Sequence, residues 1–129
     1  MRRCEGAPDT RTLAGMTDDS WLTTLLEAQP PRFPEPADVM TVLVEVPPGS
    51  PGTPPHRHSG PVFGYVLEGE LVYELEGEPA RVIRSGEAFW EPGGERIHLQ
   101  AGNNLSDRWT RFVAVMACVP GEPMLRPVT

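Results

Sequence analysis

Basic residues are scarce in this sequence, and the shortage excludes several classes of partner. The 129 residues include 18 acidic side chains against 11 lysines and arginines, a formal net charge of −7. Nucleic-acid-binding proteins need a basic face to neutralise phosphate groups, and an anionic membrane surface attracts the same kind of face. We therefore expect no nucleic acid and no membrane among the partners of this chain.

Long hydrophobic runs are absent as well. No apolar stretch reaches the roughly 20 residues that a membrane-spanning helix needs. Arg2 and Arg3 stand near the start, but residues 4–15 are polar and contain no hydrophobic region of a signal peptide. We expect a cytoplasmic protein with a disordered tail over residues 1–19, in which Met16 is an alternative start, and one domain over residues 20–129.

Cysteine occurs only twice, at the two ends of the chain. Cys4 and Cys118 form no C-x-x-C motif, so we expect free thiols rather than a disulfide. Cys118 lies in an apolar segment, where a buried cysteine behaves as a small hydrophobic side chain.

Helical periodicity, internal repeats and heptads are missing, and short segments rich in β-branched residues alternate with glycine and proline. Residues 62–68 and 71–76 are predicted to form a hairpin around Gly69-Glu70, and residues 21–27 a short strand or helical turn packed on the barrel. Strands are predicted at 38–46, 62–68, 71–76, 80–84, 88–90, 96–100 and 109–119. Many short strands separated by turn signals predict an all-β sandwich or barrel.

Histidine is also scarce, and its three copies have the spacing of ligands to one metal ion. His56 and His58 form an H-x-H step, which places two imidazoles on one face of a strand. His98 follows a second cluster of glycine and proline and could complete the set. Imidazole binds iron, manganese, nickel, copper and zinc, and three such ligands leave the open position of a catalytic site. Surface or core histidines are the alternative that spacing alone leaves open.

The residues around these histidines resemble the two sequence motifs of the cupin family. Residues 49–69 resemble the first motif, which runs glycine, five residues, His-x-His, a glutamate and a later glycine. The matching positions are His56, His58 and Gly69, and Pro51 stands where the first glycine is usual. Residues 86–103 resemble the second, with matches at Gly86, Pro92, Gly94, His98 and Asn103. The resemblance implies a double-stranded β-helix, or jelly-roll barrel, with His56, His58 and His98 as metal ligands.

One ligand of the family is missing from its usual place. The glutamate of the first motif would fall at position 62 or 63, which Val62 and Phe63 occupy. The remaining three histidines resemble the iron centre of cysteine dioxygenase and related dioxygenases, which implies an oxygenase of a small organic substrate. Without the carboxylate the site would be one charge more positive and would favour an anionic or chelating substrate. Equal binding of the same substrates by a Val62→Glu variant would contradict this hypothesis.

Several residues are candidates for the surroundings of the metal. Gln100 lies two residues after His98, so on a regular strand it would face the metal or its water, whereas Glu91 is interpreted as a turn residue at the barrel rim. If Val62 points inward, Gly64 and Val66 do too, while Phe63 and Tyr65 face outward. The predicted apolar pocket is lined by Val42, Val44, Val62, Val66, Trp90 and Met116.

Two other functions remain open: a non-catalytic protein that binds a small molecule or metal, and a non-redox isomerase or lyase. The lack of a helix-turn-helix region argues against a cupin-containing transcription regulator. The resemblance also implies a homodimer formed through edge strands. Residues 39–46 and the apolar side chains of Trp21, Leu22, Leu25 and Leu26 could cover such an edge.

Overall fold

The computed structural model describes residues 21–128, and this part of the chain contains nine strands and no helix. The strands are β1 (Asp38–Val46), β2 (His56–Arg57), β3 (Val62–Glu68), β4 (Glu70–Leu75), β5 (Arg81–Arg84), β6 (Ala88–Glu91), β7 (His98–Asn103), β8 (Thr110–Cys118) and β9 (Arg126–Pro127). The all-β prediction is confirmed. No helix of the described residues is long and apolar enough to cross a membrane. The predicted tail over residues 1–19, with Cys4 and Met16, lies outside the described residues.

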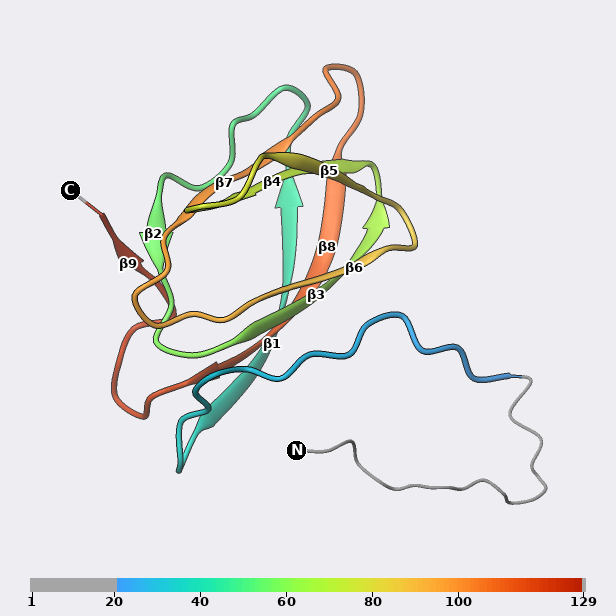
Figure 1. Cartoon of the computed structure of the whole chain (residues 1–129). Coiled ribbons are helices and arrows are strands. Elements are labelled where there is room, and N and C mark those ends of the chain that lie inside the picture. The colour runs from blue at the N-terminus through green and yellow to red at the C-terminus, as the bar shows by residue number, and fades with distance from the viewer. Residues whose placement is uncertain (1–20, 129) are drawn as a thin grey trace.

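The strands form two antiparallel sheets that enclose one hydrophobic core (Figure 1). The first sheet has the order β1-β8-β3-β6, and the second has the order β5-β4-β7-β2-β9. Their inner faces contribute the buried side chains of Val46, Val62, Val66, Leu71, Tyr73, Leu75, Ile83, Phe89, Phe112 and Met116. This arrangement is the double-stranded β-helix that the family resemblance implies. Cys118 is a buried free thiol within it.

The two-residue period predicted for the strands is confirmed along β3. Val62 and Val66 are buried, and Phe63 and Tyr65 lie on the outer face. Gly64 also faces inward, because a Cβ atom there would collide with the ring of Phe89. Period-two alternation therefore separates core from surface in this sheet.

The predicted hairpin of residues 62–68 and 71–76 is wrong. β3 pairs with β6 and β8, whereas β4 pairs with β5 and β7, so the two strands belong to different sheets. Gly69 turns the chain between them with a φ of 87°. Each strand has an apolar inner face that finds partners in its own sheet, and the glycine provides a corner rather than a hairpin turn.

The N-terminal apolar segment differs from its prediction as well. Residues 21–37 form neither a strand nor a helix, and Trp21, Leu22 and Leu25 are 84%, 68% and 54% exposed. The apolar side chains alone do not make this segment a strand, and residues 21–37 pair with no strand of either sheet.

β1 is an edge strand of the first sheet. The homodimer formed through edge strands stays a prediction.

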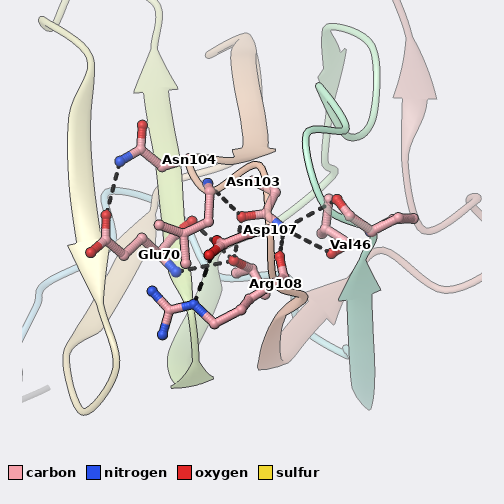
Figure 2. A network of polar contacts seen from close by, with 9 residues as sticks. Val46, Glu70, Asn103, Asn104, Asp107 and Arg108 are labelled. Atoms are coloured by element: carbon pink, nitrogen blue, oxygen red, sulfur yellow. Dashed lines mark hydrogen bonds and ion pairs between the residues drawn. The ribbon is translucent and has the colours of Figure 1, made fainter.

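A buried asparagine links the two sheets at one end of the barrel (Figure 2). The Asn103 side chain on β7 donates hydrogen bonds to the carbonyl oxygens of Val46, Pro47 and Arg108 at 2.7–3.1 Å. Its Oδ1 accepts hydrogen bonds from the Leu105 amide and the Thr110 hydroxyl. Val46 ends β1 in the first sheet, so this side chain fastens one sheet to the other.

We expect Asn103→Ala to lower the free energy of unfolding by about 2–4 kcal/mol, because it leaves several buried polar groups without partners. Asn104→Ala is the matched control, since its side chain makes one exposed hydrogen bond to Glu70; its cost should stay within about 0.5 kcal/mol. Chemical denaturation followed by tryptophan fluorescence measures both. Equal losses would show that the Asn103 network does not hold the sheets together.

The Gly69 corner generates a second prediction. Gly77 has nearly the same positive φ, 88°, but open space around it, so Gly77→Ala should cost about 1 kcal/mol from backbone conformation alone. Gly69→Ala should cost about 1–3 kcal/mol more, because its Cβ would clash with Thr110 Oγ1 and lie 2.7 Å from Trp109 O. Urea denaturation of the two variants checks the difference, and equal values would refute the packing argument.

Candidate metal centre

The second sheet brings all three histidines together inside the barrel. His56 on β2 lies directly opposite His98 on β7, and His58 follows two residues after His56. All three are 4–5% exposed, and one potential ligand nitrogen from each lies within 4.8 Å of the others. The pairing of two distant segments in one ladder therefore creates a cluster that could hold a metal ion.

Main-chain carbonyl groups fix which ring nitrogens carry protons. His56 Nδ1 lies 2.8 Å from Pro54 O, His58 Nδ1 lies 2.8 Å from Met124 O, and His98 Nε2 lies 3.0 Å from Gln100 O. A carbonyl oxygen only accepts hydrogen bonds, so each of these nitrogens must be the donor. In the neutral imidazole the other nitrogen then carries a lone pair. Such carbonyl partners orient histidine ligands in many metal sites.

The three remaining nitrogens point their lone pairs toward the same region. His56 Nε2 and His58 Nε2 are 3.1 Å apart, and neither can donate to the other when both rings are neutral. His98 Nδ1 is buried without a hydrogen-bond partner. Burial lowers the pKa of His56, which favours the neutral form that binds metals. A divalent transition metal ion would satisfy all three nitrogens, so the donor set fits such an ion.

The interpretation of Glu91 as a turn residue at the rim is wrong, because the structure places it in the centre of the site. Its side chain is 1% exposed, and Oε2 lies 2.9 Å from His98 Nδ1 and 3.6 Å from His58 Nε2. The Tyr73 hydroxyl donates to the same oxygen at 3.3 Å, while Oε1 is buried with no hydrogen-bond partner. A carboxylate is therefore present although the first motif lacks one.

The surroundings keep this carboxylate charged and its tyrosine neutral. Burial alone would raise the pKa of Glu91, but the contact with His98 and the proximity of the imidazoles of His58 and His56 outweigh burial and hold it below the ordinary value. Burial, followed by the influence of Glu91, raises the pKa of Tyr73 well above its ordinary value. Tyr73 thus remains a hydrogen-bond donor at neutral pH.

Sequence reasoning missed Glu91 because this residue precedes Pro92, which favours a turn at the end of a strand. The expected inward position of Trp90 was also incompatible with an inward Glu91, because neighbouring residues of a strand face opposite sides. In the structure Trp90 lies on the outer face, where its ring stacks on Phe63 with centroids 6.1 Å apart. The predicted pocket role of Trp90 is therefore wrong. Phe89 and Glu91 are two residues apart on β6 and therefore share a face. Placing the apolar Phe89 in the core would have indicated that Glu91 points inward too.

The other predicted lining residues keep their inward positions. Val62, Val66 and Met116 are buried in the core, and Val42 and Val44 pack against it. These side chains belong to the hydrophobic core of the barrel, and their role as walls of a ligand pocket stays a prediction.

Gln100 does not share the inner face with His98. Leu75 pairs with His98 and Glu74 pairs with Gln100, with a register shift between them that breaks the regular alternation. Gln100 therefore lies on the same side as Glu74, away from buried Leu75. Its contact with the site is made by the main-chain carbonyl that accepts from His98 Nε2. The assumption of a regular strand was wrong here.

Solved structures support the fold. The chain is 26% identical to a cupin-like protein from Thermotoga maritima, with a TM-score of 0.58 over 70% of this chain and 67% of that one. It is 29% identical to KdgF from a Halomonas species, with a TM-score of 0.52 over 65% and 72% of the two chains. DMSP lyase DddQ from Ruegeria pomeroyi matches at 21% identity and a TM-score of 0.57, over 70% of this chain and 43% of that one. No curated protein matches the sequence.

The sequence also matches a family model. The model described as "Cupin domain" aligns with residues 42–108, more than half of the 129-residue chain. This range contains the three histidines, Glu91 and strands β2 to β7 in full. The matched sequence, the two-sheet barrel and the histidine cluster agree, and the chain belongs to the cupin domain family.

Proposed function

We propose that the protein is a metal-dependent enzyme that acts on a small organic substrate at His56, His58 and His98, with dioxygenase chemistry as its reaction class. The observation that carries the proposal is the convergence of three buried imidazole nitrogens, one from each ring. The other nitrogen of each ring donates a hydrogen bond to a main-chain carbonyl oxygen. Such preorientation is what a metal site requires. A cluster that served only packing would have no need for three unprotonated nitrogens facing one another.

Different residues would bind the metal ion and surround the substrate. The histidines would hold the ion, and the carbonyls of Pro54 and Met124 keep two of the rings in the binding tautomer. When bound, a divalent ion supplies Lewis acidity and a template for the substrate. Val62, Val66 and Met116, which are buried in the core, would provide apolar walls for the substrate.

Glu91 changes one part of the sequence hypothesis. A site without any carboxylate would be one charge more positive and would favour anionic substrates. Glu91 supplies that negative charge from β6, and its Oε2 lies 2.9 Å from His98 Nδ1. With this carboxylate present, the site has no extra positive charge that would favour an anionic or chelating substrate. A small organic substrate in an apolar interior does not require such a charge.

A non-redox isomerase or lyase is the second candidate. The sequence offered no general base, but the structure places the Glu91 carboxylate beside the histidines, with Oε1 free of hydrogen bonds. The Tyr73 hydroxyl contacts the other oxygen. A carboxylate and a phenol in this position can take up and return a proton, which isomerisation and elimination both need.

Metal content tests the site directly. We expect untagged protein purified without chelator to contain close to one equivalent of a transition metal, and His56→Ala to lose it, because His56 provides one of three converging nitrogens. Gln100→Ala is the matched control, since its side chain lies on the opposite face and should leave the metal content unchanged. Elemental analysis gives the result. Absence of metal from the wild type, even after reconstitution, would refute a metalloenzyme.

Oxygen consumption separates the two reaction classes. We expect the iron-loaded protein to consume dioxygen in the presence of a substrate from a panel of thiols, diketones and enols, and His58→Ala to abolish the uptake. An oxygen electrode and product analysis by mass spectrometry provide the measurement. Turnover without oxygen uptake would favour the isomerase or lyase, and saturable binding without turnover would identify a binding protein.

A further inference from the structure

Position 91 lies directly across a strand pair from the position where the family's glutamate is missing. β3 and β6 run antiparallel, and Val62 is the register partner of Glu91. Both side chains point into the barrel, with exposures of 2% and 1%. Directly opposed residues on one face have Cβ atoms about 4.5–5.5 Å apart. A glutamate rooted at position 91 can therefore reach the same volume as one rooted at position 62.

The distances around Glu91 Oε2 fit shared ligation of one ion. Two ligand atoms about 2.0–2.2 Å from a common metal, at angles between octahedral and tetrahedral, lie roughly 2.8–3.6 Å apart. Oε2 is 2.9 Å from His98 Nδ1 and 3.6 Å from His58 Nε2, and His56 Nε2 is 3.1 Å from His58 Nε2. All three separations fall within the range for neighbouring ligands.

A hydrogen bond between Glu91 and His98 explains these contacts less well. His98 Nε2 holds its proton for the Gln100 carbonyl, and His98 Nδ1 has no hydrogen-bond partner although Oε2 is close. In the neutral ring, two atoms that both carry lone pairs face each other at 2.9 Å. Within residues 21–128, the ion-pair partners of Glu91 are His58 and His98, and no arginine neutralises it. A divalent cation would satisfy both the lone pairs and the buried charge.

We propose that Glu91 is the carboxylate ligand of the metal, supplied by β6 in place of the family position on β3. The site then has three imidazoles and one carboxylate, and Tyr73 is a positioning residue that orients Oε2 through its hydroxyl. With a divalent ion, the four ligands give the centre a net charge of plus one. The inference rests on the proposed metal site, to which it adds one ligand.

The test compares binding of Co²⁺ alone to the full-length, metal-depleted protein and its variants. Calorimetry gives the affinity, and the visible spectrum of Co²⁺ reports its coordination. We expect Glu91→Gln, which keeps the shape but loses the charge, to weaken binding by about 100-fold or more and to change the spectrum. Glu95→Gln is the control, because it removes an acid four residues away whose side chain is fully exposed; it should bind as the wild type does.

Exchange of the two residues gives a sharper test. Glu91→Val alone should lose affinity, whereas Val62→Glu combined with Glu91→Val should recover it to within about 10-fold of the wild type, because the carboxylate returns from the opposite strand. If Glu91→Val only disturbed the packing, the added glutamate at position 62 would not restore the affinity for Co²⁺. Near-UV circular dichroism verifies that each variant is folded.

A crystal structure of the Co²⁺-loaded wild type decides the matter without any substitution. We expect a Glu91 carboxylate oxygen within about 2.0–2.2 Å of the ion. A carboxylate that instead contacts a protonated His98 or a metal-bound water overturns the proposal. Wild-type affinity in Glu91→Gln overturns it as well. If His56→Ala nevertheless loses Co²⁺, the three-histidine metal site is still supported and only the role of Glu91 as a ligand is refuted. Failure of the wild type to bind Co²⁺ refutes the metal site and the ligand together.

Discussion

A carboxylate that is 1% exposed needs a positive partner inside the protein, because an uncompensated buried charge costs several kcal/mol. The partners of Glu91 in the described part of the chain are imidazoles, and their far nitrogens already hold protons for main-chain carbonyls. The interior therefore combines one negative charge with several unprotonated nitrogens. A divalent cation balances both at once, whereas a single proton can satisfy only one of the contacts.

This balance depends on how the two sheets face each other. The His56–His98 pair belongs to the second sheet and the Val62–Glu91 pair to the first. Tyr73 joins them, since its ring packs edge-on against His98 at 4.5 Å and its hydroxyl reaches Glu91. The Asn103 side chain makes a second connection between the sheets (Figure 2), and it lies at the opposite end of β7 from His98.

Local patterns predicted those parts of the molecule that depend on strand period and motif spacing. The bounds of β1, the inward set of β3 and the histidine cluster follow from alternation and from the H-x-H step. The Gly69 corner was mistaken for a hairpin because both join two alternating strands through one glycine. The position of Gln100 depends on a register shift between β4 and β7, which alternation within one strand does not reveal.

The inner face of the β3–β6 ladder shows why a ligand can change strands at little structural cost. Gly64 lies opposite Phe89, and Val62 lies opposite Glu91, so each inward pair combines a smaller side chain with a larger one. Two large side chains in direct opposition would compete for the same volume. Packing therefore limits the combined volume of the two opposed side chains, but it does not determine which strand carries the larger one. The first motif places the carboxylate on β3, so a search for that motif misses a carboxylate that reaches the same place from β6.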